Sequence, residues 1–160
     1  MRRAHSVHEM KEYVRARAEN EEHIAAVLQK LKEHHYLDDA RYARDFARTH
    51  AQGRHQGKFR IARELRVRGV PDKHIEAALE SVFAETDENA AVRARIERKL
   101  RFAHGSSRAG APLNEKKRAS LYRSLLRAGF STDVIRTELR LLGREGMADR
   151  SDPDIEVQHE

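Results

Sequence analysis

The sequence has no cysteine and no tryptophan, and proline occurs only three times in 160 residues. Without cysteine there are no disulfide bonds, thiolate metal sites or cysteine nucleophiles. Apolar runs are only a few residues long, so no membrane-spanning segment is expected. The first ten residues carry positive charge but no apolar stretch, so they do not form a secretory signal peptide. These absences predict a cytoplasmic protein, in keeping with a reducing compartment.

Charge is what the sequence has in abundance. Charged residues make up 36% of the chain, and the formal net charge is +6. Residues 41–70 contain nine Arg or Lys against two acids, a charge of +7, and residues 93–123 contain ten against two, a charge of +8. Between them, residues 71–92 contain one base against six acids, a charge of −5. Two dense basic blocks predict a surface that faces a polyanion, with a set of solvated arginine-rich helices as the alternative.

An internal repeat underlies this pattern. Strand signals are almost absent, and apolar residues recur at intervals of three and four, which predicts an all-helical protein. Stretches beginning at residues 8, 59 and 119 align without gaps, and each predicts two helices separated by a turn. Gly69 and Gly129 stand where the first helix should end, because glycine accepts the left-handed conformation of a C-terminal cap. The first copy has Ala18 at this position, so its turn must differ.

The first two copies continue into a third helix, which opens with acids at Asp38 and at Asp87. We therefore predict an all-α fold, an elongated tandem array of three-helix repeats with a truncated third repeat of two helices. The predicted units are residues 1–52, 53–104 and 105–142, with a loop from His104 leading into the third. Residues 143–160 are polar and acidic and are expected to form a disordered tail.

The adjacent acids Asp38 and Asp39 raise the question of an active site, because paired carboxylates serve acid–base catalysis or hold Mg²⁺. Neighbouring residues on a helix point about 100° apart, so these two do not converge by themselves. Capping and helix-end electrostatics explain the pair better. No zinc motif, nucleophile elbow or phosphate loop accompanies it, and the segment from Gly53 to Lys58 lacks the spacing of a phosphate loop. The sequence thus predicts no enzyme, no catalytic residue, no metal site and no cofactor.

The stretch from Tyr36 to Val70 resembles the RecX family, bacterial modulators of the recombinase RecA. The matching residues are Tyr36–Leu37–Asp38–Asp39, Arg41–Tyr42–Ala43, Gly57, Ile61, Glu64–Leu65 and Arg68–Gly69–Val70. The resemblance covers roughly residues 5–142. His35 and Lys58 stand where the family pattern has Gly and Pro, and His35 must sit at a helix end where Gly would be easier. Members usually have a longer opening helix, so either the assigned start is wrong or the first unit is pared down.

The resemblance implies a non-enzymatic regulator that binds in the groove of the RecA filament on single-stranded DNA. It would modulate, mostly inhibit, the ATPase and strand exchange of RecA in DNA repair and the SOS response. Duplex DNA, bound without sequence preference, is a further expected partner, and the protein is expected to be a monomer. The candidate contacts to RecA or DNA are the basic residues of the two blocks: Arg41, Arg44, Arg48, Arg54, Lys58, Arg60, Arg63, Arg66, Arg68, Arg95, Arg98, Lys99 and Arg101.

Two alternative functions stay open at this point. One is a sequence-indifferent DNA-binding helical-repeat protein, and the other is a scaffold that binds proteins only. Four residues in and just before the first block, Tyr36, Leu37, Tyr42 and Phe46, could stack on bases, although their helical spacing favours core packing. The acidic residues 144–160, two bases against six acids, either fold back onto the basic face or serve as a solubilising tail.

Overall fold

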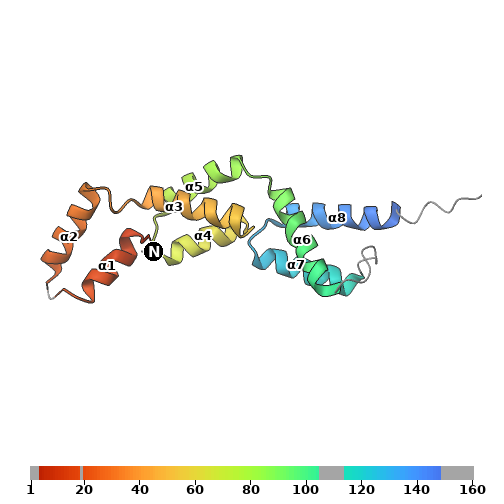
Figure 1. The fold of residues 1–160 in the computed structure, drawn as a ribbon, viewed down its shortest axis with the longest axis horizontal. Coiled ribbons are helices and arrows are strands. Elements are labelled where there is room, and N and C mark those ends of the chain that lie inside the picture. The colour runs from red at the N-terminus through yellow and green to blue at the C-terminus, as the bar shows by residue number, and fades with distance from the viewer. Residues whose placement is uncertain (1–3, 19, 105–113, 149–160) are drawn as a thin grey trace, which may run out of the picture.

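The computed structural model describes residues 4–18, 20–104 and 114–148, and all regular structure in these ranges is helical. The elements follow one another along one long axis (Figure 1). In chain order they are α1 (Val7–Arg15), α2 (Glu21–Glu33), α3 (Asp39–Arg48), a short π-helical segment η1 (Thr49–Gly53), α4 (Lys58–Val67), α5 (Asp72–Ala84), α6 (Glu88–His104), α7 (Glu115–Arg127) and α8 (Thr132–Ala148). The predicted class, an elongated all-α array, is confirmed.

Three separate cores hold these helices together. The first is small and consists of Ile24, Leu28 and Leu37, with partly buried residues of α1 against it. The second joins α3, α4 and α5 through buried residues such as Ala47, Ile61 and Ile75. The third joins α6, α7 and α8 through Ile96, Leu125 and Ile135, among others. The packed units are therefore α1–α2 (unit 1), α3–α5 (unit 2) and α6–α8 (unit 3), so the third helix of each sequence copy packs with the two helices that follow it.

The helix ends use the residues that the repeat pattern predicts. Gly69 and Gly129 have φ angles of 71° and 88°, in the left-handed region. Ala18, the third member of this column, forms an ordinary helical turn, in which its N–H donates to the Val14 carbonyl at 2.9 Å. His35 follows α2 with a φ of 55°, so it takes the conformation that favours glycine. This position is strained for a side-chain-bearing residue, as its place in the family pattern implies.

Units 2 and 3 meet through backbone atoms. The N–H of Gly57, the residue before α4, donates to the Ala128 carbonyl at 2.8 Å, and the N–H of Phe59 donates to the Gly129 carbonyl at 3.1 Å. A Cβ atom at Gly57 would overlap the carbonyl group of Gly129 and the amide nitrogen of Phe130. Because neither glycine has a side chain, the start of α4 can lie directly on the end of α7.

Units 1 and 2 meet in the equivalent way. The Ser6 hydroxyl, at the start of α1, donates to the Arg68 carbonyl at the end of α4 at 2.6 Å, and Ser6 is fully buried. A Cβ atom at Gly69 would overlap the side chain of His8. The guanidinium of Arg68 adds an ion pair to Glu9 at 3.2 Å. Both contacts place the start of one helix on the end of its counterpart in the next unit, so α1, α4 and α7 lie end to end (Figure 1).

The C-terminal part departs from expectation at one point. The repeat pattern places the end of the third copy at Leu142 and a disordered tail from Gly143, but α8 continues to Ala148. The segment 143–148 holds two glycines, Gly143 and Gly146, and no proline, and its other residues tolerate a helix, so nothing in it stops the preceding helix. The predicted loop runs from His104 to Asn114, but His104 is the last residue of α6 and Asn114 caps α7. Residues 105–113 of that loop and the acidic residues 149–160 lie outside the described residues.

Candidate nucleic-acid interface

The acid pair at the start of α3 serves helix ends. A carboxylate oxygen of Asp38 accepts the Arg41 N–H at 3.0 Å, the hydrogen bond of an N-cap. A carboxylate oxygen of Asp39 accepts the Val7 N–H at 2.9 Å, at the first turn of α1. Unit 3 repeats the first half of this arrangement, because Asp87 accepts the Ala90 N–H at 3.0 Å at the start of α6. The prediction of a capping role is confirmed, and no group of three potential metal ligands occurs in the described ranges.

The residue after Asp87 completes the parallel. Glu88 takes the place of Asp39 and lies near Lys58, the first residue of α4 and the repeat equivalent of Val7. Burial raises the pKa of Glu88 above its usual value, and the nearby Lys58 ammonium opposes the shift. The second acid of each pair thus lies near the first residue of the first helix of its own copy, Asp39 at Val7 of α1 and Glu88 near Lys58 of α4.

Replacement of Asp38 tests how much the N-cap of α3 contributes to the free energy of unfolding. The Arg41 N–H lowers the pKa of Asp38 below its usual value of 3.8, so the carboxylate stabilises the fold above about pH 4 and this contribution is lost as the pH falls through the lowered pKa. Asp38→Ala should lower the free energy of unfolding by about 1 kcal/mol at neutral pH, and less in acid. Asp38→Asn, a good cap that does not titrate, is the control for denaturant unfolding at pH 7 and pH 3. Equal stability of Asp38→Ala and the unsubstituted protein at pH 7 would contradict the assignment.

The end-to-end contact of α4 and α7 creates one continuous basic face, called here the α4–α7 stripe. Its members are exposed and recur at intervals of three and four: Phe59, Arg63, Arg66 and Val67 on α4, and Arg123, Leu126 and Arg127 on α7. Four of them line a shallow pocket at the junction together with Arg60 and Gly129, and no carboxylate lines it. In α1 the same face carries His8, Glu12, Arg15 and Ala16, so its acid and its arginine cancel. The basic face therefore belongs to units 2 and 3.

Within the described ranges, three arginines of the stripe have no carboxylate partner. They are Arg63, Arg123 and Arg127. Arg66 pairs with Asp72 at 2.7 Å, and both side chains are exposed. An exposed arginine without a partner contributes little to stability, so its planar fork is available for a phosphate or a carboxylate.

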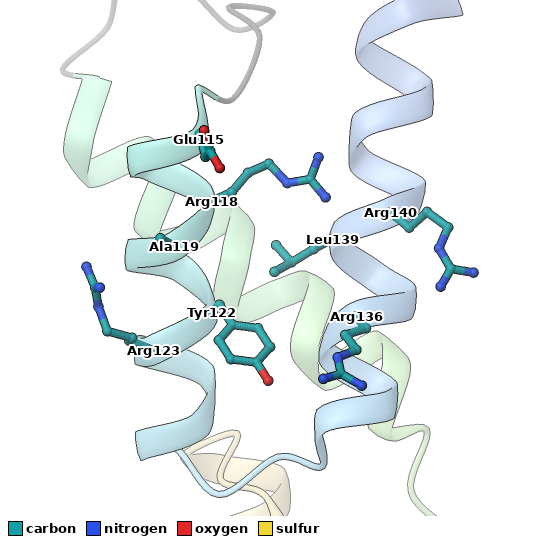
Figure 2. Close-up of a pocket in the computed structure, with 8 residues that line it drawn as sticks. All are labelled: Glu115, Arg118, Ala119, Tyr122, Arg123, Arg136, Leu139 and Arg140. Atoms are coloured by element: carbon teal, nitrogen blue, oxygen red, sulfur yellow. The ribbon is translucent and has the colours of Figure 1, made fainter.

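A second basic surface adjoins the stripe between α7 and α8. The groove has a volume of about 760 Å³. Figure 2 shows Arg118 and Arg136 extending into the gap from opposite helices, with Tyr122 and Leu139 between them and Glu115 at one end. Arg123 and Arg140 point outward on either side (Figure 2). Arg123 belongs to both surfaces, so the groove continues the stripe across unit 3.

The predicted contact residues fall into two sets. Several take part in contacts within the fold: Arg41 with Asp45 at 3.8 Å, Arg60 with Glu64 at 2.8 Å, Arg66 with Asp72 and Arg68 with Glu9. Arg60 also donates to the Arg127 carbonyl at 3.5 Å across the junction. Those without a carboxylate partner in the part of the chain that the structure describes are Arg48, Arg54, Arg63, Arg98, Lys99 and Arg101, whereas Arg44 lies near Asp38. Lys58 lies near Glu88.

The two basic blocks of the sequence come together at Arg95. Its guanidinium donates to the carbonyl oxygens of Arg54 and His55, each at 3.4 Å, which links α6 to the segment before α4. Burial lowers the pKa of Arg95, and the like charges of Arg98 and Arg60 act in the same direction. The structure thus gathers positive charge from both blocks around the start of α4, where a bound polyanion would relieve the repulsion.

Three of the four proposed stacking residues belong to the core. Leu37 is buried, and Tyr42 and Phe46 pack against the unit 2 core. Phe46 stacks on His50 with ring centroids 3.8 Å apart. The core interpretation therefore holds for these three, while Tyr36 is 77% exposed.

Sequence reasoning missed part of the basic face. It did not single out Phe59 as a contact, nor any arginine of α7 or α8: Arg118, Arg123, Arg127, Arg136 and Arg140. The repeat alignment carried a signal for one of them, because Arg123 occupies the same column as Arg63. The signal for Phe59 was its own column, because the other two copies have His8 and Ala119 there and thus no large apolar residue as a core position would.

A row of small helical units, with one basic face shared by two of them, defines the class of elongated helical-repeat proteins. Comparison with known sequences narrows this class. The sequence model of the second three-helix domain of RecX matches residues 38–79, which contain α3, α4 and most of α5. The regulatory protein RecX of Halorhodospira halophila is 37% identical over 135 residues, which cover 84% of this chain and 78% of that one. The chain belongs to the RecX family of regulatory proteins.

Further relatives agree with this assignment. The regulatory protein RecX of Prosthecochloris aestuarii is 31% identical over 137 residues, 86% of this chain and 83% of that one. The crystal structure of RecX from Lactobacillus salivarius superposes with a TM-score of 0.70 at 25% identity and covers 88% of this chain and 86% of that one. Some relatives are longer, since the chain spans 48% of the RecX of Bacillus subtilis. None of the described helices is long and apolar enough to cross a lipid bilayer.

Proposed function

We propose that this chain binds the RecA filament on single-stranded DNA and restrains its ATPase and strand exchange, without catalysing a reaction itself. The observation that carries the proposal is the α4–α7 stripe in a member of the RecX family. The stripe runs along the long axis of the array and crosses the boundary between units 2 and 3. An elongated basic face of this kind suits a linear polyanion better than a compact ligand.

The mechanism follows from geometry and charge. Arg63, Arg123 and Arg127 offer guanidinium forks, which make paired hydrogen bonds to phosphate or carboxylate groups. Each contact alone is weak, but contacts from two rigidly joined units act together, because after the first has formed the second is intramolecular. A protein that bridges neighbouring positions along a filament stabilises one arrangement of them. It therefore opposes the rearrangements that ATP hydrolysis and strand exchange require.

A second candidate function is sequence-indifferent DNA binding as the main activity. The observation in its favour is the junction pocket, which is lined by arginines, apolar side chains and a glycine but by no carboxylate. Electrostatic binding of this kind needs no protein partner and weakens steeply with salt.

The test is ATP hydrolysis by RecA filaments on single-stranded DNA. The unsubstituted protein, added below the RecA concentration, should inhibit hydrolysis, and the stripe variant Arg63→Ala/Arg123→Ala/Arg127→Ala should inhibit at least tenfold less at equal concentration. The control variant Lys30→Ala/Lys32→Ala/Lys73→Ala also removes three positive charges, from exposed positions on α2 and α5, and should inhibit normally. No inhibition by the unsubstituted protein, with salt-sensitive DNA binding retained, would leave the second candidate in place.

A further inference from the structure

We propose that Phe59 is a base-stacking residue and that the pocket at the α4–α7 junction takes an unpaired base of a single-stranded nucleic acid. This inference rests on the proposed function, in that it requires the stripe to meet nucleic acid, and it goes further by naming the strand form and the residue that selects it. The pocket has a volume of about 450 Å³ and is lined by Phe59, Arg60, Arg63, Leu126, Arg127 and Gly129.

The first observation is that the ring of Phe59 is exposed and takes no part in the hydrophobic core. Phe59 is 59% exposed, although Gly57, two positions before it, is buried at the contact between units 2 and 3. A large aromatic side chain on the surface gains little from burial, and the part of the ring that the Lys58 ammonium does not cover is open to a ligand. The buried residues of the same helix, Ile61 and Leu65, already supply its contribution to the unit 2 core.

The second observation is that the ring is held in place. The N–H of Phe59 donates to the Gly129 carbonyl at 3.1 Å, which fixes the backbone of Phe59 to the following unit. The residue lies in the first turn of α4, and the Lys58 ammonium lies 5.5 Å from the ring centroid. A ring on a rigid element loses little freedom when a ligand binds, which favours binding.

The third observation is the charge around the ring. Arg63 and Arg127 line the pocket from two different helices, and neither has a carboxylate partner in the described ranges. An aromatic face between cations fits a ligand that combines flat rings with regularly spaced phosphates, as a single strand does. In a duplex the faces of the bases are stacked on one another and only their edges and the phosphates are accessible, so the cations would find partners but the ring would find no base face to stack on. An apolar side chain of a protein partner would use the ring and Leu126 but not the arginines.

A tryptophan reporter tests the stacking directly, because the chain contains no tryptophan. In Phe59→Trp the indole emission should be quenched by oligothymidylate and should not change on binding of a duplex of equal phosphate concentration. The control is Val27→Trp, which places the reporter at a 42% exposed position on α2 in unit 1 and should respond to neither. Binding of oligothymidylate, followed by anisotropy of a labelled strand, without quenching at position 59 would overturn the proposal.

Truncation of the ring gives a second measurement. Phe59→Ala should weaken binding of the single strand about tenfold and leave duplex affinity unchanged, and Phe59→Tyr should restore most of the loss, since stacking tolerates any aromatic ring. Because the side chain is exposed, the variant should retain its helical circular dichroism. Equal losses for single strand and duplex would mean that Phe59 only supports the fold of the pocket, and an unchanged DNA affinity with weaker inhibition of RecA would assign the ring to a protein contact. Either result overturns stacking while the proposed function stands. If the unsubstituted protein binds no DNA but still inhibits RecA filaments, stacking alone is overturned. If it neither binds DNA nor inhibits RecA filaments, both proposals are overturned.

Discussion

Gly57→Ala is expected to be among the most destabilising single substitutions in this protein, although it adds only a methyl group. The φ angle of Gly57 is −78°, which any residue adopts, so backbone strain plays no part. The added Cβ atom would overlap the Gly129 carbonyl and the Phe130 amide, which are backbone atoms and cannot turn aside. Units 2 and 3 must therefore separate at this point, and the Gly57 and Phe59 N–H groups lose their acceptors.

The expected size follows from those two hydrogen bonds. A buried donor left without an acceptor costs about 1–3 kcal/mol, so Gly57→Ala should lower the free energy of unfolding by roughly 3 kcal/mol. For a chain of 160 residues this corresponds to a fall in Tm of about 10 °C. Thermal unfolding followed by circular dichroism measures the fall, and hydrogen exchange should show lost protection of the two amides.

Gly53→Ala is the matched control for this substitution. A Cβ atom at Gly53 has no neighbour within 4 Å, and its φ lies outside the left-handed region. Its Tm should stay the same or rise slightly, because alanine restricts the unfolded chain more than glycine does. If both substitutions changed the Tm equally, the close approach of the two backbones would not be what joins the units.

Removal of three arginines from the α4–α7 stripe should weaken binding to single-stranded DNA roughly 100-fold at about 0.1 M salt. Each phosphate contact to a single strand contributes about 0.7 to the slope of log affinity against log salt concentration. The stripe variant, Arg63→Ala/Arg123→Ala/Arg127→Ala, should therefore lower the slope by about 2. These arginines are exposed and have no carboxylate partner among the residues that the structure describes, so the fold should be unaffected.

The control variant Lys30→Ala/Lys32→Ala/Lys73→Ala separates position from net charge. Both variants remove three positive charges from a formal net charge of +6 and leave +3. If total charge governed binding, the two would lose affinity equally, and the stripe would have no special role. Fluorescence anisotropy of a labelled oligonucleotide over a salt series distinguishes the two results.

The sequence predicts the elements of this fold better than their grouping. The helical class, the three copies and the glycine caps follow from residue periodicity and from the conformational freedom of glycine, which are local properties. A repeat in the sequence gives the length of the repeating unit but not the residue at which each packed unit begins. That α3 packs with α4 and α5 is therefore known only from the buried residues that these helices share in the structure. The helical extension beyond Gly143 also eluded the pattern, because the segment has few apolar residues to reveal it.

The sequence predicts how much positive charge the two blocks carry but not how that charge is arranged on the surface. Charge counts find the two blocks, but they treat every arginine alike. Arg68 pairs with Glu9, which is 59 positions away, and no local rule connects them. The stripe itself exists because the end of α7 meets the start of α4, a contact made by backbone atoms of two glycine-containing turns. Exposed columns of the repeat are the part of this surface that a sequence can reveal.

The end-to-end contacts also give the array a polarity, as in a polymer with two unlike ends. At each junction the start of a helix sits on a glycine at the end of its counterpart in the following unit. Ala18 occupies the position at the end of α1 that is equivalent to Gly69 and Gly129, and it does not take the left-handed conformation. The end of α1 therefore lacks this contact site for a unit placed before it. A unit added ahead of unit 1 would therefore lack the glycine on which both observed junctions are built, and its contact with α1 would have to take another form.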